Sequence, residues 1–429
     1  MLDLTPVSWF MGGVVAYYLV LFGLSVVSPR PPQPDRDGPL MVILVPAHNE
    51  ELVIGGTIDS LLALEYGRFL VLVINDRSTD ATAAIAAAAA EASRGRVRLI
   101  ERPPALGPGG KSGTLNAGFA ALATMVEDGD VALGGAGTDD IVVGVVDADG
   151  LLDPHTLAHV APFFSDPGVG AVQIGVRIAN VGDGMLPRFQ DMEFVGFSCL
   201  VQMARDRLGS VGLGGNGQFV RLAALAGLGR APWAPSALTE DLALGLSLVE
   251  AGWRTRFCRT AFVAQQGLTT WRPLLRQRAR WIQGHYQCWA HLPALATRRR
   301  VRWVTRVDLM LYLGLVTAVM VAGFSLVAGA AGAAGVLPVT DSFLAFVPPG
   351  FGHRVVVLAV GTGPLLVLVA SYQRFAQRRL RPWEVPAYTL AFSIYCYMWC
   401  AATLWAWARM LTGRWAWVKT PRVQVVERG

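Results

Sequence analysis

The feature that most constrains the fold is a run of branched apolar residues, 141–146, which ends at two carboxylates. Apolar residues at every position predict a strand that is covered on both faces, as in a parallel sheet with helices on each side. Asp147 and Asp149 follow this run directly. In open α/β sheets, ligands bind beyond the carboxyl ends of the strands. Two carboxylates there predict a divalent cation, since Mg²⁺ is held by one or two carboxylates together with substrate phosphates. An Asp-rich turn is the alternative interpretation.

Strands and helices alternate ahead of this junction. The sequence predicts strands at 40–46, 69–74 and 97–100, with helices between them. This alternation requires parallel strands with helices on both faces. The first two strands end at polar segments that contain Asn49 and Asp76, and we expect Asn49 to cap the following helix. Polar strand ends that recur on one edge of a sheet favour a nucleotide-type site.

The segment around Lys111 is rich in glycine and resembles a phosphate-binding loop. The Walker spacing requires a glycine five positions before Gly110, and that position holds Ala105. An ATP-hydrolysing P-loop is therefore disfavoured. We expect a flexible loop that runs into a helix and places Lys111 to meet a phosphate.

Two later segments carry further polar patterns. A helix is expected to begin after Thr239, with Thr239 as its cap and with Glu240 and Asp241 in its first turn. The structural interpretation of these two acids is stabilisation of the helix dipole. Residues 271–292 have the spacing of an amphipathic helix, with Trp and Leu on one face and Arg on the other. The glycine-dense stretch 209–217 could approach a ligand closely.

The composition points to a membrane protein. Hydrophobic residues make up 53% of the chain, and the formal net charge is +6. Arginines cluster beside apolar segments, which favours a membrane surface and anionic ligands over nucleic acid. Segments long enough to cross a bilayer as helices are predicted at 7–27, 309–330, 355–370 and 385–408.

The distribution of arginine predicts the orientation. Basic residues after the first apolar segment, and a basic loop between the last two, place the α/β domain in the cytoplasm by the positive-inside rule. We expect a multi-pass protein of the bacterial plasma membrane. Three C-terminal spans would leave the C-terminus outside, whereas the basic tail favours inside, so the sequence leaves this end open.

Taken together, these residues resemble the membrane-integrated family 2 glycosyltransferases of the polysaccharide synthase type, such as cellulose, chitin, hyaluronan and poly-N-acetylglucosamine synthases. The matching motifs occur in the family's order: Val45-Pro46-Ala47-His48-Asn49-Glu50; Asn75-Asp76-Arg77-Ser78-Thr79-Asp80; Gly110-Lys111 with Asn116; Asp147-Ala148-Asp149; Thr239-Glu240-Asp241; and Gln277-Arg278-Ala279-Arg280-Trp281. They cover about residues 40 to 290. The last is the family's QxxRW pattern.

The resemblance implies an α/β, Rossmann-like GT-A domain inserted between transmembrane helices, and an inverting transfer from a nucleotide sugar with Mg²⁺ or Mn²⁺. Asp241 and Glu240 are the candidate catalytic residues. The resemblance implies Asp241 as the base and Trp281 as an aromatic platform for the acceptor, whereas Glu240, about 100° away around the helix, is expected to point elsewhere. Asp149 and Asp147 would hold the metal. The residues implied in nucleotide-sugar binding are Pro46, Asn49, Glu50, Asp76, Lys111, Asp147, Gln277 and Arg280.

The predicted organisation has six parts: a transmembrane anchor at 1–29, a linker at 30–39, the GT-A domain at 40–270, an interfacial region with QxxRW at 271–305, a transmembrane region at 306–411 and a basic tail at 412–429.

A processive polysaccharide synthase, which also translocates its product with or without a secretion subunit, is the favoured function. The alternative is a single addition to a lipid or lipid-linked acceptor. A UDP- or GDP-sugar is the expected donor, a glycan or lipid the acceptor, and membrane lipid a further partner. The set of acidic and QxxRW motifs disfavours a P-loop or non-enzymatic membrane protein.

Overall fold

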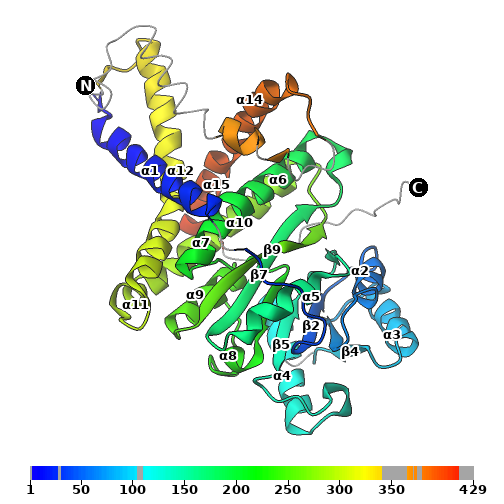
Figure 1. The fold of residues 1–429 in the computed structure, drawn as a ribbon. Coiled ribbons are helices and arrows are strands. Elements are labelled where there is room, and N and C mark those ends of the chain that lie inside the picture. Colours follow the sequence, from blue (N-terminus) through cyan, green and yellow to red (C-terminus); the bar gives the residue numbers. More distant parts are fainter. Residues whose placement is uncertain are drawn as a thin grey trace.

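An eight-stranded mixed sheet forms the centre of the α/β domain (Figure 1). The computed structural model describes residues 2–27, 30–103, 110–340, 365–370, 372–373 and 379–414. The order of strands in the sheet is β4-β3-β2-β5-β8-β7-β9-β6. The strands are β2 (Leu40–Ala47), β3 (Phe69–Asn75), β4 (Val97–Glu101), β5 (Ile141–Val145), β6 (Leu151–Leu152), β7 (Val169–Ile178), β8 (Gln218–Arg221) and β9 (Arg254–Gln265).

Alternating side chains of the strands build two cores, one on each face of the sheet. In β2, Met41, Ile43 and Val45 belong to one core, and Val42 and Leu44 belong to the other. Helices on both faces cover these cores, so every residue of β3 and β5 is buried. The predicted continuous apolar runs are therefore confirmed as strands covered on both faces.

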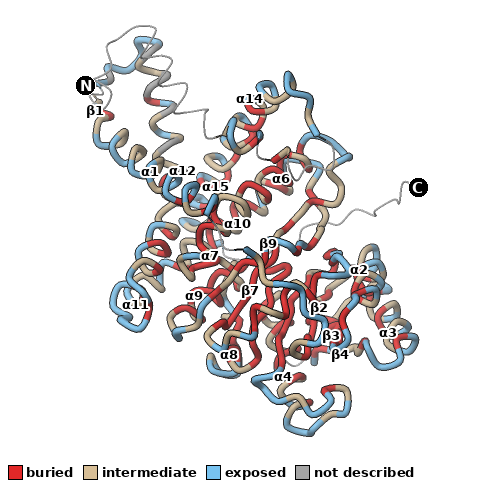
Figure 2. The backbone as a smooth tube through the Cα atoms, in the orientation of Figure 1, coloured by how far each residue is buried: buried red, intermediate tan, exposed pale blue. Residues whose placement is uncertain are grey.

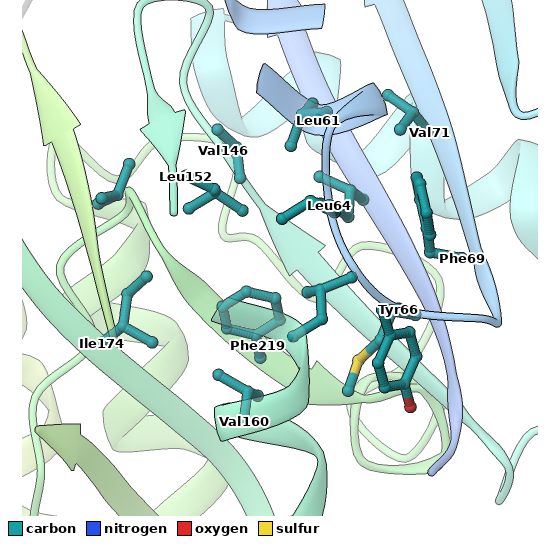
Figure 3. Packing of buried hydrophobic residues seen from close by; sticks show 14 of the residues in the cluster. Leu61, Leu64, Tyr66, Phe69, Val71, Val146, Leu152, Val160, Ile174 and Phe219 are labelled. Carbon is teal, nitrogen blue, oxygen red and sulfur yellow. The ribbon is translucent and has the colours of Figure 1, made fainter. Parts of the chain in front are cut away.

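Different helices cover the two faces. The first core receives side chains from α2 (Ile54–Leu62), α3 (Thr82–Ala92) and α5 (Thr156–Val160). Figure 3 shows part of it, with Leu61 of α2 near Val71 and Val146 near Leu152. The second core receives side chains from α4 (Gly110–Glu127), α8 (Leu222–Ala226) and α9 (Glu240–Glu250). Figure 2 shows the buried strands enclosed by partly exposed helices.

The parallel half of the sheet brings the polar strand ends to one edge. β2 pairs in parallel with both β3 and β5, with Ala47 opposite Asn75 and Leu44 opposite Val145. β8 runs antiparallel to β5 and β7, which makes the sheet mixed. Asp76 and Asp147 therefore leave the sheet on the same side, as the alternation of strands and helices predicted.

A second layer of helices packs beside the α/β domain, on the side of the polar strand ends (Figure 1). These helices are α1 (Thr5–Val26), α6 (Met185–Gly196), α7 (Met203–Leu208), α10 (Trp271–Gln287), α11 (Leu292–Thr297), α12 (Trp303–Ala333), α14 (Glu384–Cys396) and α15 (Met398–Leu411). Short strands β1 (Leu2–Asp3) and β10 (Val339–Thr340) join the start of α1 to the segment after α12.

Within the described ranges, three helices are long and apolar enough to cross a membrane: Thr5–Val26, Trp303–Ser325 and Glu384–Leu411. They overlap three of the four predicted spans. Most of the fourth, 355–370, lies outside the described residues, as does most of the basic tail.

A buried ion pair attaches two of these helices to the α/β domain. Asp308 on α12 accepts hydrogen bonds from Arg205 of α7 at 2.8 Å, from Ser210 at 2.6 Å and from Tyr17 of α1 at 2.8 Å. The ring of Tyr312 lies 3.9 Å from the Arg205 guanidinium. Because each buried charge has a partner, these candidate membrane helices meet the domain at a defined position.

Candidate active site

A cavity of ≈ 1270 Å³ begins at the carboxyl ends of β2, β3 and β5 and continues to the candidate membrane helices. Asp76, Asp147 and Asp149 lie at its sheet end, whereas Leu315 and Cys400 of α12 and α15 lie at its other end. The cavity brings together eleven of the twelve residues that the sequence singled out. These are Pro46, Glu50, Asp76, Lys111, Asp147, Asp149, Glu240, Asp241, Gln277, Arg280 and Trp281.

Asn49 is the exception, and it does not cap the helix that follows it. That helix, α2, begins only at Ile54, and Asn49 itself adopts a left-handed conformation with φ of 53°. Its Oδ1 accepts a hydrogen bond from the backbone of Thr79 at 2.7 Å, and its own N–H donates to Ser78 at 2.9 Å. The predicted cap is therefore wrong. Asn49 instead braces the loop after β3, because asparagine tolerates this backbone conformation.

Asp76 is held at the end of β3 by groups that the sequence did not reveal. Its carboxylate, 5% exposed, accepts hydrogen bonds from Arg102 at 2.9 Å, from Arg77 at 2.8 Å and from Thr114 at 3.1 Å. Burial alone would raise its pKa, but the two guanidinium groups hold the pKa of Asp76 below its usual range. An ionised acceptor therefore faces the cavity, as binding to nucleoside N–H and O–H groups requires. The only sequence signal for Arg102 was a basic residue at the end of the neighbouring strand.

Lys111, at the start of α4, lies near the carboxylates of Asp147, Glu240 and Asp241. Its ammonium forms an ion pair with Asp147 and lies 3.6 Å from Glu240 Oε1. Burial would lower its pKa, but the charges of Asp147 and Glu240 raise the pKa of Lys111 above its ordinary value. A charged ammonium therefore faces the cavity.

Asp241 follows Glu240 in the first turn of α9. Burial and the nearby charge of Glu240 raise the pKa of Asp241 to about 7, although Lys111 offsets part of this effect. Its Oδ1 accepts a hydrogen bond from the backbone of Leu242 at 2.8 Å. A half-buried carboxylate with a pKa near the working pH is suited to take a proton from a hydroxyl group.

The position of Glu240 on its helix predicted that this side chain points away from the site, and this prediction is wrong. Glu240 is 6% exposed, lines the same cavity as Asp241 and faces Lys111. The helix α9 begins at the cavity, so both residues of its first turn reach it. Thr239 occupies the N-cap position, but its side chain makes no capping hydrogen bond. The predicted N-cap position of Thr239 is therefore confirmed, whereas the capping hydrogen bond expected of its side chain is not formed.

Gly215, in the predicted glycine-dense stretch, leaves space for the Asp241 carboxylate because it has no side chain. It has φ of 76°, and a Cβ atom there would lie 2.8 Å from Asp241 Oδ2 and 3.2 Å from Lys111 Nζ. Replacing Gly215 with Ala should displace the Asp241 carboxylate and strain the backbone. We expect a loss of transfer rate on the order of 10²-fold, as for other misplacements of about 1 Å. The check is a comparison of kcat with Gly229→Ala, which also has positive φ but no atom within 4 Å. Equal losses in the two variants would contradict this role.

Asp147 and Asp149 are chemically suited to hold a metal ion together with a bound diphosphate. Both line the cavity, and Asp149 Oδ2 accepts a hydrogen bond from the backbone of Gln266 at 3.2 Å. Among the described residues, no group of three or more His, Cys, Asp or Glu side chains forms a metal cage. Two carboxylates fit Mg²⁺ or Mn²⁺ when phosphate oxygens complete the coordination.

The QxxRW residues lie on one face of α10. Arg280 donates to the carbonyl of Leu238 at 3.2 Å, and burial lowers its pKa although Glu240 and Asp241 act in the opposite direction. The ring of Trp281 packs edge-on against Phe194 at 6.2 Å between centroids. Trp281 also lines the cavity, so its ring can both pack against Phe194 and contact a bound acceptor.

Comparison with known proteins agrees with this geometry. The family described as "Glycosyltransferase like family 2" matches residues 39–284. The beta-monoglucosyldiacylglycerol synthase of Nostoc sp. is 32% identical over 316 residues, 72% of this chain and 63% of the relative. The poly-beta-1,6-N-acetyl-D-glucosamine synthase of Staphylococcus aureus is 25% identical over 286 residues, 66% of this chain and 63% of the relative. The match thus spans less than two thirds of either relative.

A solved structure has the same fold. It is a mannosyltransferase from Pyrobaculum calidifontis in complex with GDP-Man and Mn²⁺, which aligns with a TM-score of 0.61 and 19% identity over 92% of this chain and 95% of its own. The predicted GT-A fold is therefore confirmed. From the family match, the chain belongs to the glycosyltransferase-like family 2.

Proposed function

We propose that this protein transfers one sugar from a nucleotide-sugar donor to a hydroxyl group of a lipid acceptor, with inversion at the sugar carbon. The observation that carries this proposal is the single cavity that joins Lys111 and the carboxylates to helices long enough to cross a membrane. A lipid can enter such a cavity from the membrane and present its headgroup to Asp241.

The walls of the membrane end support a lipid over a sugar chain. Leu315 and Val316 of α12, Leu365, and Cys396 and Cys400 line this end, together with the hydroxyl-bearing Ser393, Tyr397 and Thr403. Apolar side chains thus predominate over hydroxyl groups there. Apolar walls favour burial of acyl chains, whereas a growing glycan needs hydrogen-bonding groups along its path. The 32% identity with beta-monoglucosyldiacylglycerol synthase points the same way.

The proposed reaction is a direct displacement. The acceptor oxygen forms a bond to the anomeric carbon while the bond to the phosphate oxygen breaks, and the electron pair leaves with the nucleoside diphosphate. Asp241 takes the proton of the acceptor hydroxyl. Lys111 and Arg280 stabilise the charge that develops on the leaving group, and Asp76 binds the nucleoside. A metal ion held by Asp147 and Asp149 would supply further charge stabilisation when bound.

A processive polysaccharide synthase is the second candidate. The QxxRW residues and the 25% identity with a poly-N-acetylglucosamine synthase favour it. In both proposals the protein is a multi-pass protein of the bacterial plasma membrane, with its α/β domain in the cytoplasm, where nucleotide sugars are made. Exposed arginines at 298–300 and 302, before α12, favour this orientation.

The product distinguishes the two candidates. We expect the purified full-length protein in nanodiscs, supplied with radiolabelled UDP- and GDP-sugars, Mn²⁺ and dioleoylglycerol, to place label in a chloroform-soluble product that carries one hexose. Mass spectrometry checks the ratio of hexose to lipid. The Asp241→Asn variant serves as the blank. Label retained in a water-soluble or insoluble polymer would contradict the lipid proposal and support the synthase.

A further inference from the structure

Two matching charge clusters join α6 to the C-terminal part of the chain. In the first, Asp191 pairs with Arg177 of β7 at 2.9 Å and accepts a hydrogen bond from the hydroxyl of Tyr372 at 2.6 Å. In the second, which we call the Arg278 cluster (Arg278, Glu193 and Tyr395), Glu193 pairs with Arg278 of α10 at 2.7 Å and accepts a hydrogen bond from Tyr395 of α14 at 2.6 Å. Each cluster thus contains an arginine, a carboxylate on α6 and a C-terminal tyrosine.

The two clusters differ in what their arginines touch. Arg278 is fully buried, donates to Gln277 Oε1 at 2.7 Å and lies 4.0 Å from the centre of the Trp281 ring. Gln277, Trp281 and Glu193 all line the cavity. By contrast, Arg177, Asp191 and Tyr372 are not among the residues that line it.

We propose that Arg278 is a positioning residue that fixes the Gln277 amide and the Trp281 ring relative to each other, and that Glu193 and Tyr395 tie this arrangement to α14. The guanidinium suits this task because its edge donates hydrogen bonds in two directions while its face covers an aromatic ring. Without it, the flexible Gln277 side chain would spread over several rotamers. The charge of Arg278 is tolerated inside the protein because Glu193 accompanies it.

This role leads to a specific kinetic signature. The donor is held mainly by other groups, namely Asp76, Lys111 and the metal site at Asp149. Loss of positioning should therefore lower kcat while the KM for the donor changes little. A lysine at position 278 keeps the charge but can neither bridge two acceptors in a plane nor stack on the ring.

The test compares Arg278→Lys, Tyr395→Phe and the matched control Tyr372→Phe in membranes that contain the full-length protein. Transfer of radiolabel from the nucleotide sugar to total membrane product, lipid and polymer together, is measured over a range of donor concentrations. We expect Arg278→Lys to lower kcat on the order of 10-fold or more, with donor KM within about threefold of the unmodified protein. Tyr395→Phe should lower kcat to a smaller extent, and Tyr372→Phe should leave it unchanged.

Two results would overturn the proposal. If Tyr372→Phe lowers kcat as much as Tyr395→Phe, both clusters merely fasten the helices. If Arg278→Lys and Tyr395→Phe both keep the unmodified kcat, Arg278 does not position the site. Should Arg278→Lys fail to accumulate, the two Phe variants, each of which removes one hydroxyl, still decide the question. The inference rests on the proposed function only for the identity of the acceptor. The assay counts lipid and polymer products together, so it tests the role of Arg278 whichever product forms. A polymer product would refute the lipid acceptor without refuting the role of Arg278.

Discussion

Replacing Asp241 with Asn is expected to lower sugar transfer by about 10²- to 10⁴-fold, the range typical of general-base loss. The amide keeps the size of the side chain but cannot accept the proton of the acceptor hydroxyl. Donor binding should persist because Asp76, Lys111 and the metal site are untouched. Radiolabel transfer measures the first effect, and calorimetric titration with the nucleotide sugar and Mn²⁺ measures the second.

The pH dependence of transfer should identify the same group. Since the pKa of Asp241 is raised to about 7, the rate should rise as the pH passes through about 7 and the carboxyl loses its proton, and then level off. Glu240→Gln removes one of the charges that raise this pKa, so the rise should move to lower pH, with a smaller loss of maximal rate than in Asp241→Asn. If Glu240→Gln abolishes transfer while Asp241→Asn leaves it near normal, the base is misassigned.

Stability provides the control for Asp241→Asn. A carboxyl group whose pKa is raised by folding, here from 3.8 to about 7, contributes stability that is full below the lower value and is lost as the pH rises through the higher one. At pH 8 the ionised, half-buried carboxylate therefore costs free energy that a neutral amide avoids. We expect the variant to melt at no lower temperature than the unmodified protein, so that lost activity cannot be ascribed to unfolding.

Replacing Asp149 with Ala is expected to have the second large effect on sugar transfer. We expect turnover to fall on the order of 10²-fold or more, because a metal ion contributes several kcal/mol of charge stabilisation. The Mn²⁺ dependence of nucleotide binding should disappear as well. Titration of the nucleoside diphosphate with and without a chelator measures this dependence.

Asp153→Ala, which removes an exposed carboxylate a few residues further on, is the matched control. A variant at Asp149 that still responds to the chelator as the unmodified protein does would contradict the metal assignment.

Local patterns in the sequence carried the prediction of the sheet. Continuous apolar runs identified β2, β3 and β5, because strands covered on both faces leave no polar positions. The polar ends of those strands placed Asp76, Asp147 and Asp149 on one edge, since the ends of parallel strands meet there. Motif spacing added the residues on α9 and α10.

The errors arose where a distant segment decides what a side chain does. Asn49 resembled a helix cap, but its oxygen is used by Thr79 in the loop after the neighbouring strand. Glu240 was assigned by angle around its helix alone, whereas the position of the helix end at the cavity decides where it points. The buried ion pairs of Asp191 and Glu193 on α6 were not predicted, because their arginine partners lie on β7 and α10.

Cross-linking of a lipid inside the cavity tests the central claim most directly. The full-length protein in nanodiscs is irradiated with a diacylglycerol that carries a diazirine in its acyl chain, and the adducts are located by mass spectrometry. We expect adducts on the cavity-lining residues Leu315, Val316 and Cys400, and we expect unlabelled dioleoylglycerol to suppress them. Adducts confined to exposed positions such as Leu311 and Leu404, at 48% and 57% exposure, and insensitive to the competitor would contradict entry of a lipid acceptor from the membrane.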